Sequence, residues 1–429
     1  MMCKCMIIIL IMCIALAPEI AVADSQPVVL DLRSASQLAL KVSPQIGSAG
    51  ASAEMTKAQV GRAKSALRPI VGLESGYSYL SKETIFGTTP VWERNTVVNR
   101  LGVQQILYSG GQMQASVNRA QQGYLAASQW VNATQADVLT NVAASYFRAR
   151  QARESIDVAE ASIKSLEASY DAAKKLHESG MVTNSDVLRA QVALTSAQEN
   201  VIKSRNNYNV AIAALRSAIG LPQDTQIELA ANASDIAPDA VATASPSERP
   251  ELAAGSASVQ AAEAGKKSAR AGRLPIVALA ADFYNQPVGA EFPRLSNTVL
   301  AGVVVKFNVF DGGLTRANIS EADAATKKAR EDLESQKRQV ELEQQAAKLD
   351  MDSANARVQT TASQVQSAEE SLRVLQTGYK EGMTPLTDVL SAETALTAAR
   401  ANRLTSLYDV KIAQVNLLRA YGQTDVLTH

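Results

Sequence analysis

The residues whose side chains could perform chemistry are few and widely separated in this chain of 429 residues. His177 and His429 are the only histidines, and the sequence contains no glycine-rich phosphate loop and no nucleophile elbow. An imidazole-rich metal site and the common nucleophilic constellations are therefore excluded. We predict that the protein is not an enzyme and that it binds no cofactor or metal ion.

All three cysteines fall within the first thirteen residues: Cys3, Cys5 and Cys13. This segment has the features of a secretory leader, because Lys4 precedes an apolar run over 6–16 and Ala21-Val22-Ala23 forms a small-x-small cleavage site. We expect removal of residues 1–23, which would leave a protein without disulfides or a cysteine nucleophile. A lipid-anchored start at Cys13 is the alternative, although Met12 fits poorly where such processing needs a small residue.

Composition narrows the fold class. Apolar residues make up 46% of the chain but aromatic residues only 4%, and alanine, which supplies much of the apolar share, favours closely packed helices over large cores. Basic and acidic residues both number 42, so no excess positive charge is available for a phosphate backbone and nucleic acid is excluded as a partner. Beyond the leader no stretch approaches eighteen apolar residues, so insertion in a membrane would require strands that close into a barrel.

The sequence contains two copies of one unit. The block GMVTNSDVL at 180–188 aligns with GMTPLTDVL at 382–390, a spacing of 202 positions. The Gly-Gly turns align at the same spacing, so that Gly110 and Gly111 match Gly312 and Gly313. We therefore expect a tandem duplication.

The duplication divides the chain as follows: repeat 1 at 24–220, a linker rich in Ala, Pro, Ser and Asp at 221–246, repeat 2 at 247–422, and a C-terminal tail at 423–429. Nearer the N-terminus the spacing becomes 206, since Pro69 aligns with Pro275. The extra four residues must arise between Pro69 and Tyr108. We expect a variable loop there, because insertions are best tolerated at exposed loop tips.

Each repeat contains one hairpin of strands, over about 70–108 and about 275–310. Apolar residues alternate with small, polar or charged ones, as in Val71, Leu73 and Tyr77 or Val299, Val303 and Val309. The runs match the 9 to 11 residues that cross a bilayer in a barrel, although a soluble sheet with one wet face fits the strands equally well. Four strands cannot close a barrel with a lumen, so several chains must combine, and three would supply twelve strands.

Long helices flank these hairpins. We expect helices over 112–178 and 314–380, each about 100 Å long at 1.5 Å per residue, return helices over 185–219 and 386–421, and shorter helices over 36–67 and 247–270. The second long segment shows a coiled-coil seam, with Val358, Val365, Leu372 and Tyr379 at heptad spacing. The broader apolar surface of the last helix favours contact with neighbours on two sides, as in a cylinder wall.

Together these features resemble the TolC family of outer membrane factors. The resemblance covers about residues 30–422, and its most specific residues are the duplicated blocks at 180–188 and 382–390 and the opening from Leu30-Asp31-Leu32 to Pro44. It implies a mainly α fold with membrane β-strands: a homotrimer whose twelve-stranded outer-membrane β-barrel, four strands per chain, is continuous with a long periplasmic α-helical barrel. It also implies outer membrane lipid, a periplasmic membrane-fusion adaptor and an inner-membrane pump as partners, and no chemistry of its own.

The resemblance also implies a pore entrance where paired helices turn, near Gly180 and Gly382. Asp388 matches an acidic ring residue that narrows the pore and favours cations, while Asp186 and Tyr379 match partners in a bond that holds the entrance shut.

The sequence departs from the family pattern at two positions. Thr384 stands where some members carry a gate arginine, and Ser391 where a second ring aspartate can lie, which implies a looser gate and a less acidic ring. Helix capping is an alternative role for both aspartates, since each falls in the first turn of a helix begun by Thr183 or Thr384, where a carboxylate gains about 0.3–1 kcal/mol from the helix dipole.

Three functions follow from these observations. The first is a passive outer-membrane duct for the efflux of small toxic compounds. Type I protein secretion is the closest alternative, because the sequence does not separate cargoes that a pump selects. A structural coiled-coil protein of the envelope is the alternative from another class, but it leaves the apolar-faced strands without a purpose.

Overall fold

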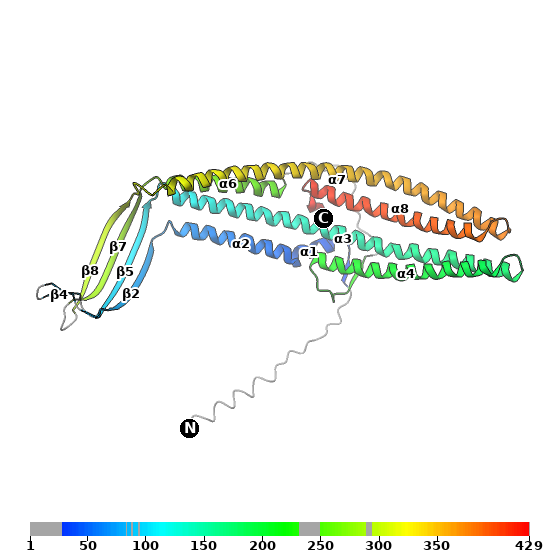
Figure 1. Cartoon of the computed structure of the whole chain (residues 1–429), viewed down its shortest axis with the longest axis horizontal. Helices are drawn as coiled ribbons and strands as arrows, with labels where there is room; N and C mark the ends of the chain where they lie inside the picture. The colour runs from blue at the N-terminus through cyan, green and yellow to red at the C-terminus, as the bar shows by residue number, and fades with distance from the viewer. Residues whose placement is uncertain are drawn as a thin grey trace, which may run out of the picture.

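The computed structural model describes residues 28–82, 84–86, 89–92, 95–230, 249–288 and 294–428. The expected leader with its three cysteines, most of the expected linker and His429 lie outside these residues. The chain is mainly helical and elongated (Figure 1). A four-stranded sheet lies at one end, and the turns that join α3 to α4 and α7 to α8 lie at the other. Among the described helices, none combines the length and apolar character that crossing a membrane demands.

Two helices of 67 residues run the length of the molecule, α3 (Gln112–Glu178) and α7 (Leu314–Lys380). Each begins directly after a Gly-Gly turn whose second glycine has a left-handed backbone, with φ of 84° at Gly111 and 93° at Gly313. Each then reverses into a shorter antiparallel partner, α4 (Asn184–Ile219) and α8 (Leu386–Ala420). The two helical hairpins lie side by side along the molecule (Figure 1).

The single helix expected over 36–67 is two helices, α1 (Leu32–Val42) and α2 (Pro44–Ser65). Ser43 between them has an extended backbone (ψ 121°), as expected for a residue before proline. Helix α1 starts earlier than predicted because Asp31 caps it, accepting a hydrogen bond from the Ser34 backbone at 2.7 Å. The helix expected over 247–270 is α6 (Pro250–Ala271), with proline at its first position.

The sheet has the order β2-β5-β7-β8 and is antiparallel throughout: β2 (Ile70–Tyr79), β5 (Asn95–Tyr108), β7 (Ile276–Val288) and β8 (Arg294–Lys306). Pairing of β5 with β7 joins the two repeats. The prediction that the last strand continues to 310 is wrong, because β8 ends at Lys306, opposite Ile276. Strand β7 begins at Ile276, directly after Pro275, which has no N–H to donate to a ladder.

Two further strand pairs extend the description. A small hairpin, β3 (Thr84–Phe86) with β4 (Thr89–Trp92), lies within the first large hairpin, in the segment where we expected the variable loop. The expected linker is structured at its start, where β6 (Ile227–Leu229) pairs in parallel with β1 (Val28–Leu30). Three-residue strands are too short to show a recognisable alternation in the sequence.

The main core lies midway along the molecule, where α1, α3, α4 and α8 converge. Its largest fully buried side chains are Tyr146 and Phe147, whose rings pack edge to face with centroids 5.6 Å apart. The expected C-terminal tail contributes to this core, because Thr424–Thr428 forms the 3-10 helix η1 and Leu427 is buried.

A network of ion pairs, buried at its centre, joins four helices beside this core. Arg249, at the start of α6, contacts Glu251 at 3.1 Å and Glu343 of α7 at 2.7 Å. Arg419 of α8 also binds Glu251, and it contacts Asp137 of α3 at 2.7 Å. Burial alone would raise the pKa of Glu251, but hydrogen bonds from the two guanidinium groups outweigh it and lower the pKa to about 2.

Candidate functional site

The candidate entrance consists of the two turns that join α3 to α4 and α7 to α8. Gly180 and Gly382 both have left-handed backbones, with φ of 78° and 74°. In each turn the residue after the glycine closes the preceding helix: Met181 donates its N–H to the Leu176 carbonyl at 2.9 Å, and Met383 donates to Gly378 at 2.8 Å. The turns of the two repeats therefore share one backbone design, a helix end closed by a left-handed glycine.

The helices that leave these turns begin differently. Thr183 caps α4. Its backbone N–H (3.3 Å) and its hydroxyl (3.1 Å) both donate hydrogen bonds to the carboxylate of Asp186. In α8 the cap is Pro385, not Thr384 as we expected. Because proline has no N–H, Asp388 cannot form the bond to the cap that Asp186 forms. Asp388 is exposed, and its carboxylate has no hydrogen-bond partner in the described part of the chain.

Thr384 packs inside its own turn. It is half-buried, and its hydroxyl occupies the space that a Cβ atom at Gly378 would need. A side chain at Gly378 would therefore displace Thr384. Gly378 and Thr384 therefore allow the α7–α8 turn to close tightly. Some members of the TolC family carry a bulky arginine at the position of Thr384.

Tyr379 is 4% exposed and lies at the end of α7, close to Asp186. Burial raises the pKa of its phenol, and the negative charge of Asp186 raises it further. The bond implied between Tyr379 and Asp186 is not present here, since the Tyr379 hydroxyl is without a hydrogen-bond partner among the described residues. The carboxylate of Asp186 is instead engaged by Thr183.

The two helical hairpins contact each other above these turns through a second apolar cluster. It contains buried residues of all four long helices: Ala173, Ala190, Leu372, Tyr379, Leu386, Val389, Ala392 and Leu396. One carboxyl group lies at its edge, because Glu393 of α8 is 2% exposed and accepts hydrogen bonds from Ser165 of α3 and Gln376 of α7. Burial raises the pKa of Glu393. The contact between the hairpins is thus mostly apolar and non-directional.

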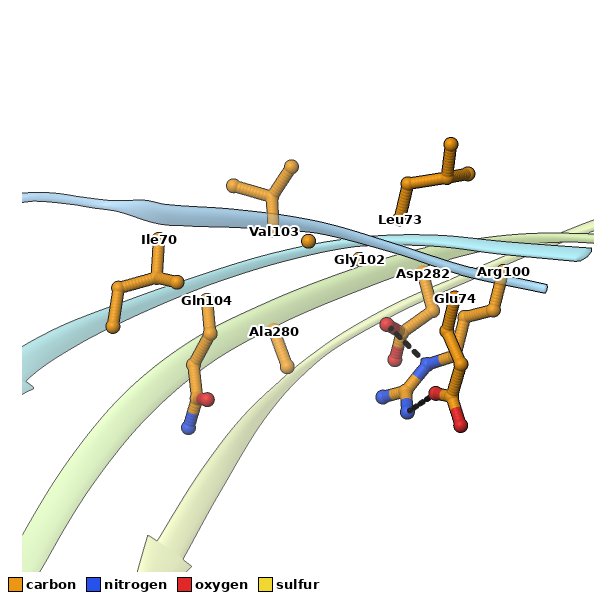
Figure 2. A pocket seen from close by; sticks show the side chains of 10 residues that line it. Ile70, Leu73, Glu74, Arg100, Gly102, Val103, Gln104, Ala280 and Asp282 are labelled. Atoms are coloured by element: carbon orange, nitrogen blue, oxygen red, sulfur yellow. Dashed lines mark hydrogen bonds and ion pairs between the residues drawn. The ribbon is translucent and has the colours of Figure 1, made fainter.

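At the opposite end of the molecule, one face of the sheet carries a charged cluster (Figure 2). Arg100 on β5 lies between Asp282 on β7, at 3.0 Å, and Glu74 on β2, at 3.6 Å. Gly102 makes the cluster possible, because a Cβ atom there would lie 2.6 Å from the Asp282 carboxylate. The sequence predicted a polar face but not this grouping, since it depends on the pairing of β5 with β7.

Within the part of the chain that the structure describes, no group of three or more His, Cys, Asp or Glu residues could hold a metal ion. His177, the one histidine described, lies beside the α3–α4 turn, where its ring is 3.0 Å from the Val182 carbonyl. His177 therefore acts as a polar residue that hydrogen-bonds to the backbone at the end of a helix.

Comparison with known proteins decides the family. A family model described as outer membrane efflux protein matches residues 35–221 and 244–423, which include most of both repeats. The chain belongs to the outer membrane efflux protein family. This membership confirms the resemblance to the TolC family and assigns the protein to the outer membrane, with its helices extending into the periplasm.

Individual members of the outer membrane efflux protein family are distant relatives. Identity is 28% over 309 residues with protein CyaE of Bordetella pertussis, covering 70% of this chain but 64% of CyaE. It is 24% over 389 residues with outer membrane efflux protein BepC of Brucella suis, covering 90% of this chain and 84% of BepC. The chain therefore spans slightly less than two thirds of CyaE and most of BepC.

The fold of this outer membrane efflux protein matches solved channels closely. Against the crystal structure of the outer membrane protein VceC from Vibrio cholerae the TM-score is 0.79, with 20% sequence identity, and the match covers 91% of this chain and 96% of that chain. The helical hairpins and the four-stranded sheet therefore form a fold that this chain shares with VceC.

Proposed function

We propose that this protein is the outer-membrane channel of a tripartite export system and that it works as a homotrimer. The observation that carries the proposal is an incomplete sheet. Among the described strands, β2 and β8 each pair on one side only, so the sheet has two open edges. An open edge in lipid leaves backbone groups unpaired at several kcal/mol each, and three copies of four strands would close a barrel without edges.

The exposed surfaces of one chain support this assembly. On the sheet face opposite the charged cluster, Leu73 is 77% exposed and Val299 72% exposed, which a water-soluble sheet would avoid and a lipid-facing one requires. On α4, Val192 and Ile202 are also more than two-thirds exposed. Neighbouring copies in a helical barrel would cover them.

The partners and cargo follow from the family. We propose a periplasmic membrane-fusion adaptor and an inner-membrane pump as partners, because membership of the outer membrane efflux protein family supports a place in such an assembly. Small toxic compounds are the proposed cargo, since the family and BepC are both described as efflux proteins. We propose no reaction for the protein itself. A structural coiled-coil role would leave the exposed apolar face of the sheet unused.

The trimer can be tested directly. Protein purified in detergent should migrate as a trimer that dissociates on heating, and it should conduct ions when added to planar bilayers. A monomer that stays soluble without detergent would contradict the proposal. Deletion of the gene should lower the concentrations of dyes and antibiotics that inhibit growth; loss of a secreted protein with unchanged drug sensitivity would favour type I secretion.

Asp388 provides a prediction for the entrance. Because its carboxylate is exposed and without a capping partner, we expect Asp388→Ala to reduce the preference of the channel for K⁺ over Cl⁻ by about twofold or more, as for other acidic rings in pores. Reversal potentials under a salt gradient measure this preference. Asp186→Asn is the matched control, since that carboxylate is engaged in a cap and its loss should leave selectivity nearly unchanged. Unchanged selectivity in Asp388→Ala would contradict the ring.

A further inference from the structure

Charge is unevenly distributed along this neutral chain. Between Met55 and Leu73, where α2 leads into β2, there are four basic residues and no acidic one. Between Ala264 and Ala281, where α6 leads into β7, there are again four basic residues and no acidic one. Both segments approach the same end of the sheet (Figure 1). Positive charge is therefore concentrated where helices meet strands.

Six of these residues are exposed and form no ion pair with the described part of the chain, and the five nearest to the strands are Arg62, Lys64, Arg68, Lys267 and Arg273. We call them the basic collar. Their neighbours Lys266 and Arg270 differ, because both approach Asp323 of α7, at 2.5 and 3.9 Å. Asp323 is thus already paired with two other cations, whereas no ion pair with the described residues neutralises the five collar residues.

The helix dipole does not account for the collar. A cation is stabilised in the last turn of a helix, which could explain Lys64 in α2. Arg68 and Arg273, however, lie beyond the ends of α2 at Ser65 and α6 at Ala271. The positive charge continues past the helices up to the first residues of the strands.

A row of polar side chains crosses the apolar face of the sheet. Ser75 and Asn99 are joined by a hydrogen bond of 2.7 Å, Asn285 and Asn297 by one of 2.9 Å, and Asn99 pairs with Asn285 in the ladder. The row crosses all four strands at one level. On this face Leu101 lies in the adjacent row towards the helices, and Tyr77 and Val97 lie in the next row on the other side.

The distance between the collar and this polar row fits a membrane. Arg273 lies three residues before β7 begins at Ile276, and nine residues separate Ile276 from Asn285 along the strand. At about 3.3 Å per residue and a tilt of about 40° these nine residues rise roughly 23 Å, close to the apolar band of about 25 Å on a membrane barrel. The collar and the polar row are therefore separated by about the thickness of this band, and the collar lies on the helical, periplasmic side.

We propose that the basic collar binds the phosphate groups of anionic phospholipids in the periplasmic leaflet, phosphatidylglycerol above all. This inference rests on the proposed outer-membrane placement. Lys and Arg close to a membrane surface attract anionic headgroups, and the attraction is screened by salt. Exposed guanidinium groups such as Arg68 and Arg273 also suit bidentate contacts with phosphate.

The test compares lipids on the intact trimer. The apparent Tm of the protein in detergent is measured after adding phosphatidylglycerol, phosphatidylcholine or soluble glycerol phosphate. We expect phosphatidylglycerol alone to raise the Tm. The rise should be smaller in 0.5 M NaCl than in 0.03 M NaCl, because the electrostatic screening length is roughly fourfold shorter at the higher salt concentration. Replacing all five collar residues by glutamine should remove at least about half of the rise.

The matched control replaces five other exposed basic residues that also lack an ion pair within the described residues but lie away from the sheet: Arg33, Lys41, Arg148, Lys164 and Lys348. It should keep the full response to phosphatidylglycerol. An equal response to phosphatidylcholine, or an undiminished response in the collar variant, would overturn the inference. Trimer formation and conductance of the same preparations report on the channel separately, so a failure of the proposed function would be recognised as such.

Discussion

Replacing Glu251 by glutamine is expected to destabilise the protein by about 3–5 kcal/mol, the usual cost of removing one partner from a buried ion pair. The Glu251 carboxylate binds both Arg249 and Arg419, and Arg249 is itself almost completely buried. A neutral amide would remove the negative charge that balances the largely buried guanidinium groups of Arg249 and Arg419. For a chain of this length the Tm should fall by about 4 °C, measured by circular dichroism on the detergent-solubilised protein. Glu341→Gln is the matched control, because that carboxylate is exposed on α7 and forms no ion pair with the described residues.

The same substitution predicts a pH dependence. The pKa of Glu251 is lowered to about 2 in the folded protein from a usual value of 4.5. Its contribution to stability is therefore complete above pH 4.5 and declines as the pH falls through 4.5 towards 2. The difference in Tm between wild type and Glu251→Gln should narrow over this range. A difference that stays constant down to pH 3 would show that the ion pairs are not its origin.

Gly220→Ala is expected to be strongly destabilising. Gly220 ends α4 with φ of 94°, a conformation that costs a residue with a side chain about 1–2 kcal/mol. An added Cβ would also lie 2.8 Å from Pro44 Cδ and 3.1 Å from Ser43 Cα, at the junction of α1 and α2. Overpacking adds about 1–3 kcal/mol, so we expect a total loss of about 2–5 kcal/mol.

Gly180→Ala separates these two causes. Gly180 has a similar φ of 78°, but nothing lies within 4 Å of the Cβ position. Its replacement should cost only the backbone strain, about 1–2 kcal/mol. The difference in unfolding midpoint between the two variants therefore measures the overlap with Pro44. Equal losses in both would contradict the close approach of the α4 end to the α1–α2 junction.

The long elements could be predicted because their patterns are repeated many times. The expected helices at 112–178 and 314–380 coincide with α3 and α7, since each is bounded by a Gly-Gly turn and a single glycine. The break between α1 and α2 carried a visible signal, Ser43 before Pro44, which the helical periodicity around it obscured. Local signals of this kind lie within a few residues of the feature that they specify.

Other features depend on residues far apart in the sequence. Arg249 meets Glu343 and Arg419 meets Asp137 only because four helices converge. Arg100 reaches Asp282 because β5 pairs with β7 in one particular register. At the candidate entrance, Asp186 and Asp388 occupy matching positions in the two repeats. The cap residue is threonine at Thr183 but proline at Pro385, and this difference decides which carboxylate forms a hydrogen bond to its cap. The ion pairs leave no local pattern, whereas the cap formed by Thr183 and Asp186 spans only three residues and could be read from the sequence.

The open edges of the sheet also determine how faulty chains affect the assembled particles. If three copies share one wall, a cell that makes sound and faulty chains in equal amounts would assemble only about one fully sound particle in eight. A lesion in β2 or β8 of one gene copy would then act dominantly, whereas a lesion that prevents secretion of the chain would be recessive.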